Sequence, residues 1–235
     1  MEKADVSIII PAYNEERRIH KTLEKTLEYL KNQSWKSEII VVDNGSTDNT
    51  IAVAKKFKNV KLLSENTRGK GAAVRKGMLN SSGKFRLFSD ADLSTPITEL
   101  DKFMRDSKHF SVLIGSREIP GAKLEVPQSF ARRFIGRGFS FLVELILGLG
   151  ITDTQCGFKM FSEAAAKKIF NTQKLNGWGF DVELLYLAQK YGFGIKEIPV
   201  KWINDKNTKV RWHAPFYMLL DVLQIRFNRL RGRYR

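Results

Sequence analysis

Residues 6–11 have the sequence VSIIIP, a run of mostly β-branched side chains that stops at a proline. A short apolar run of this kind predicts a strand buried on both faces. Apolar residues then recur at helical spacing over residues 19–30, and further apolar strands are predicted at residues 38–42 and 85–88. The alternation of such strands with helices predicts an α/β fold with a mostly parallel central sheet flanked by helices.

The second half of the chain is less regular, and its character changes near residue 117. The pattern predicts a strand at residues 111–115, a helix at 129–149, a helix at 180–191, a strand at 195–202 and a final amphipathic helix at 215–230. The longest apolar stretch, residues 139–151, is shorter than the roughly 20 residues that span a bilayer. No signal-peptide pattern precedes the first strand. We therefore expect a soluble or peripheral protein.

The chain is strongly basic, with a formal net charge of +15 over 235 residues. This charge indicates an anionic partner, and nucleic acid, anionic lipid and a phosphorylated substrate all satisfy it. Residues 206–235 concentrate the charge, with eight Lys or Arg residues and a single Asp. The one cysteine, Cys156, excludes an intramolecular disulfide and favours a reducing compartment.

Polar residues follow three of the predicted strands, at residues 13–15, 43–48 and 90–92. Ligands of parallel α/β sheets bind at the carboxyl ends of the strands, so these clusters are expected at one edge. Asp90 and Asp92 suit a hard cation such as Mg²⁺ or Mn²⁺, which also takes diphosphate oxygens. The alternative is a solvated turn with two loop aspartates.

Other residues are weaker candidates. Asp43 could accept from a base or a ribose hydroxyl, or it could form an Asx turn, whereas Asp48 suits a helix cap. Residues 68–71 (RGKG) form a basic, glycine-rich turn suited to anion contact. Arg117 and a group of arginines further along the chain suit phosphate, with a solvated basic helix face as the alternative. That group is Arg132, Arg133 and Arg137.

Several of these segments resemble a known family. Residues 6–15, 42–48 and 90–92 resemble the motifs of family 2 inverting glycosyltransferases with the GT-A fold. A second set of segments resembles dolichyl-phosphate β-glucosyltransferases in particular. The dolichyl-phosphate mannosyltransferases are closely related to these enzymes. The second set comprises residues 68–75, 115–117, 153–159 and 178–185.

The resemblance implies a role for particular residues. The nucleoside would be bound by Pro11, Ala12, Tyr13, Glu15 and Asp43, with Lys70 nearby. Asp90 and Asp92 would hold the metal and the diphosphate, and Ala91 would line the sugar nucleotide. Arg117 and Arg132 would hold the acceptor phosphate, and Lys209 would close on the donor. Ser94 stands where mannosyl relatives carry a Gln ligand, which puts a third metal ligand in doubt.

The implied reaction is inverting transfer of glucose from UDP-glucose to a polyprenyl (dolichyl) monophosphate, with Mg²⁺ or Mn²⁺ as cofactor. GDP-mannose transfer to the same acceptor is the rival enzyme, and a nucleic-acid-binding protein is the rival class. A glycosyltransferase domain would occupy residues 1–212, with a donor half to about residue 117 and an acceptor half over 118–212. Asp181 and Glu183 could orient the acceptor, or they could form the exposed start of a helix.

The segment 213–235 is expected to form a basic amphipathic helix. Its apolar stripe and its terminal arginines suit a helix in the headgroup layer of an anionic membrane. The alternative is that the stripe packs on the domain and the arginines are a solvated tail. The first interpretation places the protein peripherally on the cytoplasmic face of a membrane, as part of protein glycosylation, with nucleotide sugar, lipid acceptor and membrane as partners.

Overall fold

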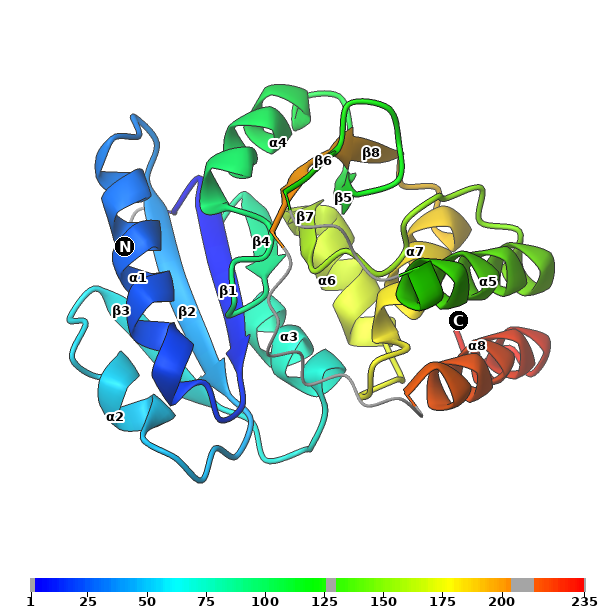
Figure 1. The fold of residues 1–235 in the computed structure, drawn as a ribbon, viewed down its shortest axis with the longest axis horizontal. Helices are drawn as coiled ribbons and strands as arrows, with labels where there is room; N and C mark the ends of the chain where they lie inside the picture. The colour runs from blue at the N-terminus through cyan, green and yellow to red at the C-terminus, as the bar shows by residue number, and fades with distance from the viewer. Residues whose placement is uncertain (1–2, 126–129, 204–213, 235) are drawn as a thin grey trace.

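The computed structural model describes residues 3–125, 130–203 and 214–234, and it leaves the side chains of residues 130–135, 137 and 214–216 undescribed. Within these ranges, seven strands form one sheet in the order β3-β2-β1-β4-β7-β5-β8 (Figure 1). The strands are β1 (Val6–Ala12), β2 (Ser37–Asp43), β3 (Val60–Ser64), β4 (Phe85–Ser89), β5 (Val112–Ser116), β7 (Phe158–Ser162) and β8 (Ile195–Pro199).

Strand directions confirm the predicted mostly parallel sheet. Strands β3, β2, β1 and β4 are parallel neighbours, and so are β5 and β8. Strand β7 lies antiparallel between β4 and β5. The sequence did not predict β7, because the fully buried Lys159 interrupts its apolar run. Two short strands, β6 (Lys123–Leu124) and β9 (Lys201–Trp202), form a separate parallel pair, and β9 lies at the end of the strand predicted over residues 195–202.

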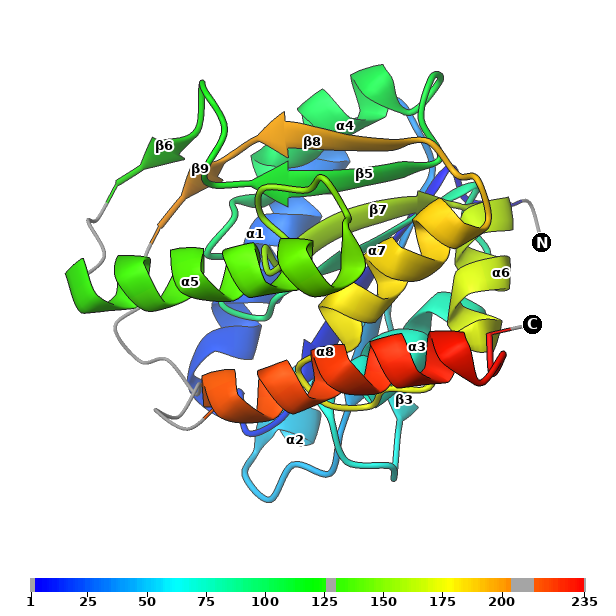
Figure 2. The same ribbon diagram turned by 90° about the vertical axis from the view of Figure 1, so that its right-hand side faces the viewer.

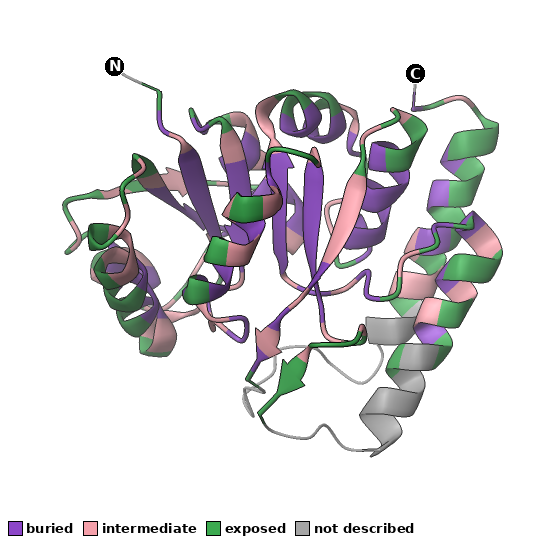
Figure 3. Ribbon diagram, turned by 90° about the horizontal axis from the view of Figure 1, so that it is seen from above, coloured by how far each residue is buried: buried purple, intermediate pink, exposed green. Residues whose placement is uncertain are grey.

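Helices cover both faces of the sheet. One face carries α1 (Glu16–Lys31), α2 (Thr50–Ala54), η1 (Ile97–Glu99) and α4 (Leu100–Asp106). The other carries α3 (Lys70–Leu79), α5 (Phe130–Leu147), α6 (Glu163–Thr172), α7 (Phe180–Lys190) and α8 (Ala214–Leu230). Alternate residues of β1 supply the two cores, since Ile9 faces one and Ile8 and Ile10 face the other. Figure 3 shows the buried strands between the outer, exposed helix faces.

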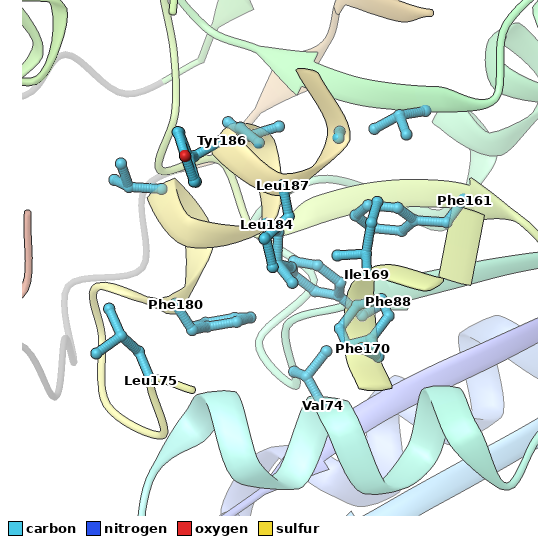
Figure 4. Close-up of a cluster of buried hydrophobic side chains, with 14 of the residues drawn as sticks. Val74, Phe88, Phe161, Ile169, Phe170, Leu175, Phe180, Leu184, Tyr186 and Leu187 are labelled. Carbon is cyan, nitrogen blue, oxygen red and sulfur yellow. The ribbon is translucent and has the colours of Figure 1, made fainter. Parts of the chain in front are cut away.

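The core on the α3 side is rich in aromatic rings (Figure 4). The Phe88 and Phe180 rings lie 5.7 Å apart, and the Phe161 and Phe170 rings meet edge to face at 5.3 Å. Each of these rings comes from a different element, namely β4, α7, β7 and α6. Packed aromatic pairs of this kind stabilise a fold beyond the area that they bury. They fix the start of α7 against the carboxyl end of β4.

Helices α5 and α8 pack against each other (Figure 2). Val222 and Ile225 of α8 are fully buried, whereas Leu223 and Phe227 are about half exposed. Helix α8 therefore has an inward face and an outward apolar face. None of the helices in the described ranges is long and apolar enough to cross a membrane. The predicted bounds of both helices agree with the structure to within two residues.

Candidate active site

The loops after β1 and β2 are tied together by hydrogen bonds. The Asn14 N–H donates to Ser46 Oγ at 2.9 Å, and the Thr47 N–H donates back to Asn14 Oδ1 at 2.8 Å. Asn14 adopts a positive φ of 52°, which asparagine tolerates better than most residues. The Glu15 N–H donates to Thr50 Oγ1 at 2.7 Å. These bonds hold residues 11–15 beside the end of β2.

The residues predicted to bind the nucleoside meet at this edge of the sheet. Pro11 and Ala12 pair in register with Val42 and Asp43. Ala12 is buried, Pro11 and Glu15 are half-buried, and 44% of Tyr13 is exposed. The structure thus brings this predicted group to one place. The group consists of Pro11, Ala12, Tyr13, Glu15 and Asp43.

Asp43 forms the Asx turn that was the alternative to a role in binding the nucleoside. Its carboxylate is buried and accepts from the N–H groups of Gly45, at 3.1 Å, and Ser46, at 3.3 Å. This turn does not exclude nucleoside contact, because a carboxylate has about four acceptor positions. Asp48 accepts from the N–H groups of Thr50 and Glu16, which fits the predicted capping role.

Asn44 links this edge to the start of α3. Its amide nitrogen donates to the Thr67 carbonyl at 2.7 Å, and its oxygen accepts from the Gly69 N–H at 2.8 Å. Gly69 has a φ of 128°, and a Cβ there would lie 2.0 Å from the Asn176 carbonyl oxygen. Only glycine fits this position, so the backbone approaches closely where α3 begins.

The segment Asp90–Asp92 follows β4 and is held by its backbone. The Asp90 N–H donates to the Gly157 carbonyl at 3.1 Å, and the Ala91 carbonyl accepts from the Thr22 hydroxyl at 2.5 Å. A Cβ at Gly157 would lie 2.0 Å from Asp90 Oδ2. The glycine that precedes β7 and a threonine of α1 therefore fix the segment. Thr22 could not be predicted as part of the site, because nothing in its local sequence distinguishes it from other helix threonines.

The two carboxylates remain accessible, with 36% of the Asp90 side chain and 25% of the Asp92 side chain exposed. Asp92 Oδ1 accepts from the Ser94 N–H at 2.9 Å. Burial and the neighbouring charge of Asp90 raise the pKa of Asp92 above its ordinary value. Two close, accessible carboxylates suit a divalent cation with oxygen ligands. In the described ranges no cluster of three His, Cys, Asp or Glu side chains is placed to bind a metal.

Lys70, the first residue of α3, reaches the same point. Its Nζ lies 2.6 Å from Asp90 Oδ1 and 5.5 Å from the centroid of the Trp178 ring. Burial alone would lower the pKa of Lys70, but Asp90 and then Asp181 outweigh it and the pKa is raised. The amine is therefore cationic at neutral pH and is placed to meet an anionic group beside Asp90.

Behind Lys70 lies a fully buried ion pair between Lys159 of β7 and Asp181 of α7. Lys159 also donates to the Cys156 carbonyl at 2.7 Å. Burial raises the pKa of Asp181, although Lys159 and Lys70 act against it. Of the two interpretations left open for Asp181 and Glu183, the exposed helix start is wrong, because both residues are buried. A lysine inside an apolar strand was the one available signal for this pair.

Comparison with known proteins identifies the family. The model of glycosyl transferase family 2 matches residues 7–170. A dolichyl-phosphate β-glucosyltransferase of Trichomonas vaginalis is 38% identical over 94% of this chain and 72% of its own length. The human protein of that name is 35% identical over 98% of this chain and 77% of its own length. The chain belongs to glycosyl transferase family 2.

Solved structures agree on the fold. A glucosyl-3-phosphoglycerate synthase from Mycobacterium tuberculosis, in complex with Mn²⁺, UDP and glucosyl-3-phosphoglycerate, has a TM-score of 0.67 to this chain. It is 18% identical, and the match covers 98% of this chain and 80% of the synthase. The predicted GT-A fold is confirmed.

The phosphate ligands predicted for this family 2 glycosyltransferase are described only in part. Arg117, at the end of β5, forms a two-point ion pair with Asp153, with Nε–Oδ2 at 2.7 Å and Nη2–Oδ1 at 2.8 Å. Its guanidinium carbon lies 5.4 Å from the centroid of the Trp202 ring. The backbone of Arg132 falls within α5, but its side chain lies outside the described residues, as does Lys209 entirely.

Proposed function

We propose that this glycosyltransferase moves glucose from UDP-glucose to the phosphate of dolichol or another polyprenol, with inversion at the anomeric carbon. The observation that carries the proposal is the accessible Asp90–Asp92 pair at the sheet edge where β1 and β2 also end. The names of the relatives above 30% identity support the sugar and the acceptor. The synthase bound to UDP supports a uridine nucleotide as leaving group.

The residues at this edge fit a divalent cation. Asp90 and Asp92 offer oxygen ligands, which Mg²⁺ and Mn²⁺ prefer, and both carboxylates follow the same strand and remain partly exposed. When bound there, the cation would neutralise the diphosphate of the leaving UDP. Lys70, 2.6 Å from Asp90, adds a second positive charge at the same place.

The proposed reaction needs no strong general base. An oxygen of the acceptor phosphate forms the new bond to the anomeric carbon, while the bond from that carbon to the β-phosphate oxygen breaks. UDP leaves with the electron pair of the broken bond. A phosphate monoester with a second pKa near 6 is largely ionised at pH 7, so it attacks as the anion. Asp181, a buried carboxylate whose charge acts on Lys70, is already paired with Lys159.

Arg117 and Arg132 are the proposed acceptor-phosphate ligands. Asp153 occupies two of the five guanidinium N–H donors of Arg117, and this pairing fixes the direction of the rest. Burial would lower the pKa of Arg117, but Asp153 outweighs it and the pKa is raised, so the charge is permanent. What the enzyme would supply to the phosphate is orientation and removal of water.

A peripheral position on the cytoplasmic face of a membrane is part of the proposal. The outward face of α8 exposes Leu220, Leu223, Phe227 and Leu230, and α5 adds Phe141 and Leu145. Exposed arginines accompany them at positions 226, 229, 231 and 233. An apolar face with a basic border suits insertion into the headgroup layer of an anionic bilayer. A lipid-linked acceptor would be met at that surface.

The test is a donor panel with a short-chain polyprenyl phosphate. The full chain is incubated with UDP-glucose, UDP-galactose or GDP-mannose in Mn²⁺ or Mg²⁺, and both the released nucleotide and the glycolipid are measured. We expect UDP release and a β-linked glucosyl lipid from UDP-glucose alone. Product formed from GDP-mannose instead would replace the glucosyl assignment with the mannosyl one. Equal turnover in EDTA would remove the metal from the proposal.

A further inference from the structure

The loop between α6 and α7, residues 173–179, lies directly on the first turn of α3. The Ala72 N–H donates to the Asn176 carbonyl at 3.3 Å, and Gln173 Nε2 donates to the Gly71 carbonyl at 3.1 Å. Gly69 admits the loop only because it has no side chain. Trp178, at the far end of the loop, lies near the Lys70 amine. The loop therefore fixes the backbone from which Lys70 reaches Asp90.

The opposite side of the loop is held by Glu183, which is fully buried. Its carboxylate accepts from the Lys174 N–H at 3.0 Å and from the Leu175 N–H at 2.8 Å. Burial raises the pKa of Glu183, and these donors act against it. A carboxylate in this position holds two adjacent backbone groups of the loop at once.

Glu183 is in turn fixed by the C-terminal end of the chain. The Tyr234 hydroxyl donates to Glu183 Oε1 at 2.7 Å, although the two residues are 51 positions apart. Tyr234 is only 1% exposed, and Asn228 Nδ2 donates to its hydroxyl oxygen at 3.3 Å. The Tyr191 hydroxyl donates to the Tyr234 carbonyl at 3.2 Å. The ring is thus held in a defined place.

Helix α8 contacts the loop at a second point. Asp221 Oδ2 accepts from the Gly179 N–H at 3.0 Å, next to Trp178. Tyr234 and Asp221 therefore hold the two ends of the loop, one through Glu183 and the other directly. Neither residue lies at the sheet edge, and among the described residues neither makes a hydrogen bond or ion pair to Asp90 or Asp92.

We infer that Tyr234 and Asp221 are positioning residues for the diphosphate end of the donor site, acting through loop 173–179 on Lys70. The inference rests on the proposed function for the identity of the ligand. Its physical basis is a continuous set of hydrogen bonds from α8 and its tail to the first turn of α3. Loss of either contact loosens the loop, and with it the backbone that aims Lys70 at an anionic ligand.

The first measurement is UDP affinity in Mn²⁺, by calorimetry on the full chain. Tyr234→Phe keeps the ring and removes the donor to Glu183, and Asp221→Ala removes the acceptor for Gly179. Each is expected to weaken UDP binding about 3- to 10-fold, the value of one hydrogen bond. Asp221→Asn retains an acceptor oxygen and should restore most of the affinity. Gln224→Ala, on the exposed face of the same helix, serves as the control.

A purely structural role predicts a different result. Variants with a lowered Tm but with UDP affinity and donor KM within twofold of the wild type would overturn the inference. The acceptor KM should be unchanged in all four variants, because the contacts lead to the Lys70 end of the site.

Hydrogen exchange supplies a readout that needs no ligand. Tyr234→Phe should speed amide exchange in peptides covering residues 173–180 and 69–75, and leave β1 and β2 unchanged. Unchanged exchange over 69–75 would overturn the inference even if the loop itself loosened. If the wild type binds no uridine nucleotide, the proposed function fails, whereas the exchange result still decides whether α8 positions the start of α3.

Discussion

Two pairs of aspartates in the molecule have opposite surroundings. Asp90 and Asp92 stand at the sheet edge with roughly a third and a quarter of their side chains exposed. Asp153 and Asp181, further along the chain, are almost fully buried, and each forms an ion pair with a basic side chain. The accessible carboxylates are in a position to bind a ligand, whereas the buried, paired carboxylates fix the positions of other side chains.

This contrast explains why the two pairs of aspartates should respond differently to substitution. Removing an accessible carboxylate changes what the site can bind but leaves the fold intact. Removing one member of a buried pair leaves an uncompensated charge in a medium of low dielectric constant.

The largest effect is expected for Lys159→Met. The substitution keeps the apolar length of the side chain and leaves Asp181 buried without its partner, which costs about 3–5 kcal/mol of unfolding free energy. Urea denaturation at pH 7 measures the loss. The double variant Lys159→Met/Asp181→Leu should recover most of it, because both charges are then absent. A single variant as stable as the wild type would show that the pair does not behave as a buried charge.

Asp92→Asn should instead affect turnover. The substitution preserves size and the acceptor for the Ser94 N–H, so the free energy of unfolding should change by no more than about 0.5 kcal/mol. Glucosyl transfer in Mn²⁺ should fall about 100-fold or more, because the cation contributes several kcal/mol to transition-state stabilisation. Glu24→Gln, on the exposed face of α1, is the control. Wild-type turnover in Asp92→Asn would remove this carboxylate from the site.

Arg117→Lys tests a residue that pairs with a buried carboxylate and is also proposed to hold the acceptor phosphate. The variant keeps the charge and loses the planar fork that meets Asp153, so the acceptor KM should rise about tenfold while UDP affinity stays unchanged. Steady-state kinetics with a short-chain acceptor and calorimetry with UDP separate the two. An unchanged acceptor KM would mean that Arg117 serves only to hold Asp153.

The smallest effect is expected on the outward face of α8. Leu223→Ser together with Phe227→Ser removes half-exposed apolar area, so binding to anionic liposomes should weaken about 3- to 10-fold with little change in Tm. Cosedimentation measures the binding, and Gln224→Ala is the matched control. Truncation of the helix is a poorer test, because it would remove the buried Ile225 and Tyr234. Unchanged liposome binding would contradict the membrane proposal.

Much of the fold could be predicted from the sequence. Strands β1, β2 and β4 are nearly continuous apolar runs that end in polar residues, and this pattern places Asp43, Asp90 and Asp92 at one edge without knowledge of distant contacts. Strand β7 depends on such a contact. Strand β7 was missed because Lys159 makes it look amphipathic, and the lysine is tolerated only because Asp181 approaches from α7.

The same limit applies to the site. Neither Thr22 nor Tyr234 differs locally from other residues of its type, since each acquires its role from a partner more than 50 residues away. Glu183 looked like part of an exposed helix start, whereas Lys174, Leu175 and Tyr234 all donate to it. Sequence periodicity reports burial within one element, and it carries no information on which elements meet.

Cys156 offers a practical consequence. It is the only cysteine in the sequence, it is fully buried, and burial raises the pKa of its thiol to about 11. A maleimide reacts with the thiolate, which Cys156 hardly forms at neutral pH. A cysteine introduced at the exposed Leu223 would therefore take up a fluorescent or spin label alone, with no background substitution needed. A probe at that position would report directly how deeply α8 enters a lipid bilayer.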